Sequence, residues 1–139
     1  MAKFNIVIAT HGRFGEELVK SAEMITGKME NVQVLSLLPT MSFEDFMKQA
    51  DEILAKTEQP MIVLTDLFGG TPCNVFTALS RKYHHDVVSG VNLSMLIDLY
   101  VTTLNMDDGD VNVEELAENC IATLKESGVH TNKRLDDEE

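Results

Sequence analysis

The stretch NIVIATHGRFG, residues 5–15, decides the fold of this chain. Its apolar run, which Phe4 precedes, stops abruptly at His11 and is too short for a buried helix. A run of this kind is typical of a strand in a parallel sheet whose two faces are both covered. Thr10, His11 and Gly12 then lie at the carboxyl end of the strand, just before a helix begins. Because open α/β sheets hold ligands and reactive groups at this edge, His11 is a candidate functional residue.

A second stretch, MIVLTDLFGGTPCN at residues 61–74, repeats this design and ends its apolar strand at Asp66. In a doubly wound sheet of order 2-1-3-4-5, the first and third strands are neighbours, so their carboxyl ends meet. We therefore expect His11 and Asp66 to be in contact. A carboxylate that accepts a hydrogen bond from one ring nitrogen fixes the tautomer and leaves the other nitrogen as an oriented nucleophile.

The residues after Asp66 predict a site for an anion. Gly69 and Gly70 let the backbone approach a ligand closely, and Thr71 with Pro72 is typical of the N-cap and first position of a helix. The free N–H groups of such a helix end bind phosphate well. A histidine beside a phosphate cradle indicates phosphoryl transfer, in which backbone N–H groups and the Thr71 hydroxyl position the group and no metal or other cofactor is needed.

These motifs resemble the mannose-type IIA phosphocarrier domain of the bacterial sugar phosphotransferase system (PTS), over nearly the whole chain. The likeness is carried by IVIATHG at residues 6–12, TDLFGGTPCN at 65–74 and GVNLSML at 90–96. It implies that His11 is the phosphorylated residue and Asp66 its carboxylate partner. It also implies that the small protein phospho-HPr is the donor, that the IIB component is the acceptor, and that the membrane components are reached indirectly.

Two positions depart from the family pattern, which usually has an aromatic residue at Cys73 and a proline at Ser94. Neither change removes a chemical group from the site, so both concern packing and partner choice. The family component contacts only proteins, so no sugar site is expected in this chain. No Pro/Ala-rich linker follows Leu135, and we therefore expect the IIB component on a separate chain.

Composition predicts one domain at residues 1–135 and a short acidic tail at 136–139. The chain has 139 residues and a formal net charge of −12, which argues against nucleic acid and anionic membranes as partners. No apolar segment approaches the roughly 20 residues of a membrane span, and the start lacks signal-peptide features, so we expect a cytoplasmic protein. Cys73 and Cys120 fit buried free thiols, because no metal or redox spacing surrounds them.

Strands and helices alternate along the chain, which predicts an α/β fold: a doubly wound, mostly parallel five-stranded sheet of order 2-1-3-4-5 with helices on both faces. The last strand, Val129–Leu135, is expected to be an antiparallel edge strand. His84 and His85 fall in a turn and are expected at the surface. The remaining expected elements are strands at 32–38 and 86–89 and helices at 14–25, 43–54, 71–79, 93–104 and 113–124.

Two features predict a homodimer. The helix at 93–104 is apolar almost all the way round, which suggests burial on more than one side. Residues 129–135 place Val129, Thr131, Lys133 and Leu135 on one face, and His130, Asn132 and Arg134 make the other face too polar to hold a sheet edge alone. Exchange of this strand between two subunits would cover both exposed edges, and the resemblance implies the same exchange.

Other classes of protein fit the sequence less well. A phosphohistidine phosphatase or mutase has arginine directly before its histidine, where this chain has Thr10. A receiver domain shares Asp66 but needs acids after the first strand, and a P-loop would need G-x-x-x-x-G-K-[ST]. The alternative that remains is the phosphotransfer subunit of a dihydroxyacetone kinase, which lacks the GGTP of residues 69–72. Two interpretations of Arg13 fit the sequence equally well: a position on a solvated helix face, and a role near the phosphoryl group.

Overall fold

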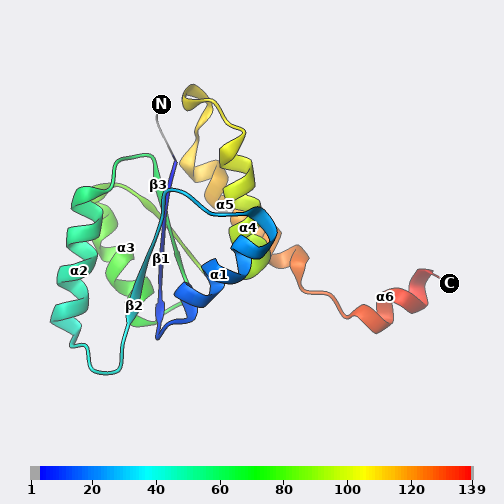
Figure 1. Ribbon diagram of the computed structural model, residues 1–139, viewed down its shortest axis with the longest axis horizontal. Helices are drawn as coiled ribbons and strands as arrows, with labels where there is room; N and C mark the ends of the chain where they lie inside the picture. Colours follow the sequence, from blue (N-terminus) through cyan, green and yellow to red (C-terminus); the bar gives the residue numbers. More distant parts are fainter. Residues whose placement is uncertain (1–3, 139) are drawn as a thin grey trace.

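A computed structural model, which describes residues 4–138, contains one parallel sheet with helices on both faces (Figure 1). Its strands run in the order β2-β1-β3-β4, as the sequence predicts for the first four strands of the sheet. Every neighbouring pair is parallel. The strands are β1 (Asn5–His11), β2 (Val32–Leu37), β3 (Met61–Thr65) and β4 (Asp86–Ser89).

The helices form two layers around the sheet. In Figure 1, α2 and α3 lie on one side of the sheet, while α1, α4 and α5 lie on the other. A short 3-10 turn, Asp108–Asp110, joins α4 to α5. The helices are α1 (Phe14–Thr26), α2 (Phe43–Lys56), α3 (Thr71–Tyr83), α4 (Leu93–Leu104), α5 (Val113–Ser127) and α6 (Thr131–Glu138).

Strand β1 shows why its sequence is a continuous apolar run. Ile6 and Ile8 pack in the core on the side of α1, α4 and α5, whereas Val7 and Ala9 pack in the core on the side of α2 and α3. All four side chains are essentially buried. Because successive side chains of a strand point to opposite faces, a strand between two helical layers needs apolar residues at every position.

The predicted fifth strand is wrong. Residues 131–138 form helix α6, and the sheet of the described residues has four strands, all parallel. Figure 1 shows that this C-terminal helix lies away from the sheet and the other helices. Residues 129–137 are all exposed, so no packing on the sheet fixes an extended backbone. Helix α6 also extends across the domain boundary expected after residue 135, and that boundary stays a prediction.

Helix α4 is covered mostly by its own chain. Met95, Leu96, Leu99 and Tyr100 are buried in the core that α4 shares with α1 and α5. The apolar character of this helix therefore has an explanation within one subunit and is not by itself a sign of an interface. The free thiols of Cys73 and Cys120 are buried, as expected.

His85 is a second correction, because it is buried rather than at the surface. Only 3% of the residue is exposed, and its Nε2 donates a hydrogen bond to the carbonyl of Phe76 at 2.8 Å. Its ring also meets the Phe76 ring edge to face. Burial lowers the pKa of His85, although the nearby Asp86 and the bond to Phe76 act in the opposite direction.

Candidate functional site

The parallel pairing of β1 with β3 brings the two predicted site residues together. Ala9 lies beside Thr65 in this register, so His11 and Asp66 follow at the same edge of the sheet. Nδ1 of His11 lies 3.0 Å from Oδ2 of Asp66. The backbone N–H of His11 donates to the same oxygen at 3.1 Å. Asp66 therefore holds both the ring of His11 and the end of β1.

This contact determines which nitrogen of the ring is available for chemistry. An ionised carboxylate only accepts hydrogen bonds, so Nδ1 of His11 carries the proton and Nε2 keeps its lone pair. No hydrogen bond to Nε2 occurs within residues 4–138. The side chain of His11 is 44% exposed, against 16% for Asp66. Asp66 thus holds the ring at Nδ1, while Nε2 is open to a partner.

Gly70 lies directly against the ring of His11. A Cβ at this position would come within 2.6 Å of Cε1 and 3.3 Å of Nε2, and real Cβ atoms essentially never show a contact below 3.0 Å. A side chain at residue 70 would therefore push the ring away. The second glycine of the pair is needed for this close approach, which the sequence predicted only in general terms.

The same glycine begins helix α3. Gly70 is the N-cap, with φ −77° and ψ 166°, so Thr71 is the first helical residue rather than the predicted cap. The backbone N–H groups of Thr71 and Cys73 have no acceptor inside the helix, and Pro72 has no N–H. Because Nε2 of His11 adjoins Gly70, an anion on that nitrogen would lie at the positive end of α3.

Asn74 is a supporting residue that sequence reasoning missed. Its side-chain amide donates to the carbonyl of Gly69 at 3.1 Å, and its backbone N–H donates to the carbonyl of Gly70 at 2.9 Å. Gly69 itself has φ +84°, a conformation that favours glycine. Asn74 thereby fixes the glycine pair from inside α3. Its place at the end of the TDLFGGTPCN motif was the available signal.

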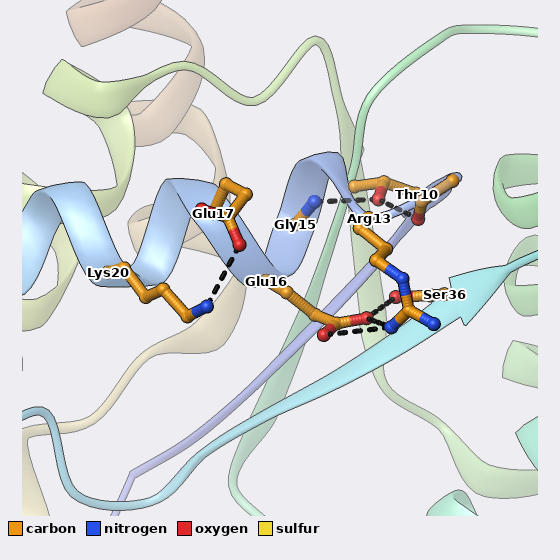
Figure 2. A network of polar contacts seen from close by, with 8 residues as sticks. Thr10, Arg13, Gly15, Glu16, Glu17, Lys20 and Ser36 are labelled. Atoms are coloured by element: carbon orange, nitrogen blue, oxygen red, sulfur yellow. Dashed lines mark hydrogen bonds and ion pairs between the residues drawn. The ribbon is translucent and has the colours of Figure 1, made fainter.

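Thr10 is a second residue that the sequence did not single out for a role. Its side chain is fully buried, and its Oγ1 accepts a hydrogen bond from the backbone N–H of Gly15 at 2.8 Å (Figure 2). It satisfies one of the free N–H groups at the start of α1. Thr10 therefore ties β1 to α1 directly beside His11.

Arg13 lies on the other side of β1 from Asp66. Its Nη1 contacts the two carboxylate oxygens of Glu16 at 3.1 and 3.3 Å, and Glu16 accepts a short 2.6 Å hydrogen bond from Ser36 on β2 (Figure 2). The bond from Ser36 is the largest of the effects that lower the pKa of Glu16. The carboxylate consequently stays ionised and holds the guanidinium.

One oxygen of the site has no partner. Oδ1 of Asp66 is buried and accepts no hydrogen bond from the described residues. A buried carboxylate oxygen without a donor is costly, so Asp66 is stabilised when its neighbour gains positive charge. The ring of His11 gains such charge whenever its second nitrogen binds a proton or a phosphoryl group.

Metal sites and membrane spans each require features of their own. Within residues 4–138, no three His, Cys, Asp or Glu side chains gather closely enough to hold a metal ion. The helices of the same residues include none with the length and apolar content that a membrane span requires.

Comparisons with known proteins point in one direction. The sequence model of the EIIA-man family, described as the PTS system fructose IIA component, matches residues 5–120. The chain is 37% identical over 127 residues to the PTS system mannose-specific EIIAB component of Escherichia coli strain K12, covering 87% of this chain. It spans only 37% of that relative's length.

Two further relatives match this chain along almost their whole length. The PTS system sorbose-specific EIIA component of Lacticaseibacillus casei is 28% identical and is covered over 98% of its length. The crystal structure of the phosphotransferase system component EIIA from Streptococcus agalactiae superposes with a TM-score of 0.83 at 32% identity, covering 94% of this chain and 98% of that one. The family model covers well over half of the chain, and the chain therefore belongs to the mannose-type IIA family of the bacterial sugar phosphotransferase system.

Proposed function

We propose that this protein is a phosphohistidine carrier, which accepts a phosphoryl group from phospho-HPr on His11 and passes it to a IIB component. The observation that carries the proposal is the geometry of the His11 ring. Nδ1 is bound to Asp66 at 3.0 Å, while Nε2 lies open against the N-terminus of α3. Such a carrier fits the family and acts as a phosphotransferase without a cofactor. The GGTP of residues 69–72 favours it over the dihydroxyacetone kinase subunit.

The transfer step is an exchange of one N–P bond for another. The lone pair of His11 Nε2 attacks phosphorus, and the N–P bond of the donor histidine breaks with its electron pair returning to the donor ring. No proton has to move if each ring keeps the proton on its other nitrogen. The His11 ring then carries positive charge beside Asp66, whose carboxylate stabilises it.

Gly69, Gly70 and Thr71 form the proposed phosphoryl-binding loop. The N–H groups of Thr71 and Cys73 at the start of α3 are suitable donors, and the Thr71 hydroxyl adds another. These are neutral donors in an open site, so they hold the group without trapping it. A carrier requires this balance because it must release the phosphoryl group to the IIB component.

The test is labelling by phospho-HPr, with the four histidines as internal controls. The intact chain should take up one acid-labile phosphoryl group per subunit, and His11→Gln should take up none while keeping its circular dichroism spectrum. His84→Asn, at an exposed position at the end of α3, is the matched control and should label normally. Labelling that survives in His11→Gln, or that resists acid, would contradict the carrier function.

We also propose that the carrier is a homodimer in which each copy's C-terminal arm, residues 129–138, lies in a groove of the other. The groove has a volume of about 480 Å³ and runs along the free edge of β4 between α3 and α5. Asp86, Glu114 and Glu118 contribute acids to its lining. Residues 129–137 of the arm are exposed in their own chain. Lys133 is opposite in charge to the acids of the groove and can pair with them, whereas Asp136 and Asp137 must lie beyond these acids.

Light scattering tests the dimer. The intact chain should have the mass of two subunits at micromolar concentration, and deletion of residues 129–139 should give a monomer or an aggregate. Glu114→Lys with Glu118→Lys should weaken the dimer, since two acids of the groove are then reversed. A monomeric intact chain, or an arm deletion that still dimerises, would overturn this arrangement.

The expected cytoplasmic location stays a prediction, which cell fractionation can test.

A further inference from the structure

The edge of the sheet that holds His11 has very few charges. Four loops connect the carboxyl ends of the strands to the helices that follow: residues 12–13, 38–42, 66–70 and 90–92. All four lie within the described part of the chain. Their charged side chains are Arg13 and Asp66 alone, and Asp66 is already engaged with His11. Arg13 is therefore the one lysine or arginine on these loops.

Arg13 and Asp66 flank His11 from opposite sides. Asp66 follows β3, which pairs with one edge of β1, whereas Arg13 reaches toward β2, which pairs with the other edge. Ser36, which binds the Glu16 partner of Arg13, lies beside Thr10 in the register of β1 with β2. The two loop charges thus lie toward the two strands that neighbour β1, with Asp66 against the ring and Arg13 on Glu16.

The ion pair between Arg13 and Glu16 can break at little cost in free energy. The side chains of Arg13 and Glu16 are 64% and 34% exposed, and they are three residues apart at the start of α1. Exposed ion pairs of this kind stabilise a protein little, because water screens both charges. Moving the guanidinium away from Glu16 therefore costs little.

A phosphoryl group on His11 would be a stronger partner, if the chain is the carrier proposed above. Such a group brings nearly two negative charges and three acceptor oxygens. The Cα atoms of residues two apart are separated by at most about 7 Å, and a turn at Gly12, with φ +56°, brings His11 and Arg13 closer. An arginine side chain spans that separation, and its planar guanidinium binds phosphoryl oxygens through two parallel hydrogen bonds.

We propose that Arg13 is a switching cation, which pairs with Glu16 in the unphosphorylated protein and with the phosphoryl group on His11 during transfer. Arg13 forms no covalent bond; it neutralises charge on the phosphoryl oxygens while one N–P bond breaks and the other forms. Glu16, which Ser36 holds in place, is the resting partner of the guanidinium: it competes with the phosphoryl group for Arg13 and accepts Arg13 back when that group leaves. The reversible pairing suits a carrier that must both receive and give.

Helix α1 offers a matched control. Lys20 and Glu17 form an ion pair of the same spacing, with 3.0 Å between Nζ and Oε2, one helical turn further from His11 (Figure 2). Arg13→Met and Lys20→Met each remove one cation of α1 and keep an unbranched side chain. They differ in whether the lost charge lies next to the phosphorylated ring.

The experiment measures two quantities on the intact protein: the rate of labelling by phospho-HPr, and the pH titration of the phosphohistidine phosphorus by ³¹P NMR. Arg13→Met should slow labelling by about tenfold, well below the effect of arginines in enclosed phosphoryl-transfer sites because this site is open. It should also raise the pKa of the bound phosphoryl group by up to about one unit, since a nearby cation is lost. Lys20→Met should match the wild type in both.

Glu16→Gln separates a switch from a purely structural ion pair. If Arg13 switches, Glu16→Gln removes the carboxylate that competes for the guanidinium and should make labelling faster than in the wild type, opposite in direction to Arg13→Met. If the pair is structural, the two variants slow labelling alike, which would overturn the proposal. An unchanged rate and titration in Arg13→Met would overturn it too. Failure of the carrier function itself is distinguishable, because the wild-type protein would then take up no label on His11.

Discussion

Substitution of Gly70 by alanine tests the geometry of the site with a single methyl group. The added Cβ would lie 2.6 Å from Cε1 of His11, whereas ordinary contacts begin at 3.4 Å, so the ring must move by about 0.8 Å. The backbone of Gly70, at φ −77° and ψ 166°, suits alanine, so the strain falls on the ring and not on the main chain. The nearest way to relieve it is to displace the ring from Asp66.

A displacement of that size has a predictable effect on transfer. Misplacing a reacting group by about 1 Å costs on the order of 100-fold in rate, equivalent to about 2.7 kcal/mol of activation free energy. Loss of the glycine N-cap should lower the free energy of unfolding by no more than about 1 kcal/mol. We therefore expect Gly70→Ala to fold and to accept phosphoryl groups on the order of 100-fold more slowly.

The assay is the initial rate of labelling by phospho-HPr, together with urea denaturation of the same samples. Gly128→Ala is the matched control, because its added Cβ would meet nothing within 4 Å and its φ is −87°. This control should label at the wild-type rate. A Gly70→Ala protein that labels as fast as the wild type would refute the view that the ring must lie against Gly70.

Three further predictions follow from individual contacts. Asp66→Asn should slow labelling by at least about tenfold, because an amide cannot balance the charge that the His11 ring gains; an unchanged rate would mean that Asp66 has no part in transfer. Burial lowers the pKa of His85 in the folded protein, so as the pH falls the unfolded chain binds a proton on this residue before the folded one does. Stability should therefore fall as the pH drops below about 6.5, by at most about 1.4 kcal/mol per pH unit from this group. The urea midpoint of the wild type should fall between pH 7 and pH 5. His85→Gln should show a smaller fall, whereas His84→Asn should show the same fall as the wild type. Burial raises the pKa of Cys120 to about 12, so iodoacetamide should spare this thiol in the native protein and modify it in urea; rapid native modification would contradict its burial.

The sequence revealed those parts of the fold that its hydrophobic pattern determines. Continuous apolar runs identified β1 and β3, because strands covered on both faces need apolar residues at every position. The carboxyl-end rule for parallel sheets then placed His11 next to Asp66, which the structure brings to 3.0 Å. The glycine pair before α3 indicated a close approach, and the approach is to the His11 ring itself.

The errors arose where the sequence carries weak information about tertiary contacts. Residues 129–135 contain only two apolar side chains, Val129 and Leu135, which are too few to fix a strand on the sheet. A segment without tertiary packing follows its local helix propensity instead. His85 appeared to be a turn residue because its burial depends on Phe76, nine positions away. The link from Glu16 to Ser36 joins α1 to β2, so the spacing of residues along α1 could not show it.

The bond between phosphorus and Nε2 of His11 is the central claim, and NMR of the phosphorylated protein labelled with ¹⁵N tests it most directly. Phosphorus should couple to Nε2 of His11, while Nδ1 keeps a proton that faces Asp66. This pattern is expected because Asp66 holds Nδ1 and the N-terminus of α3 faces Nε2. Phosphorus coupled to Nδ1, or to a nitrogen of any other histidine, would contradict the account.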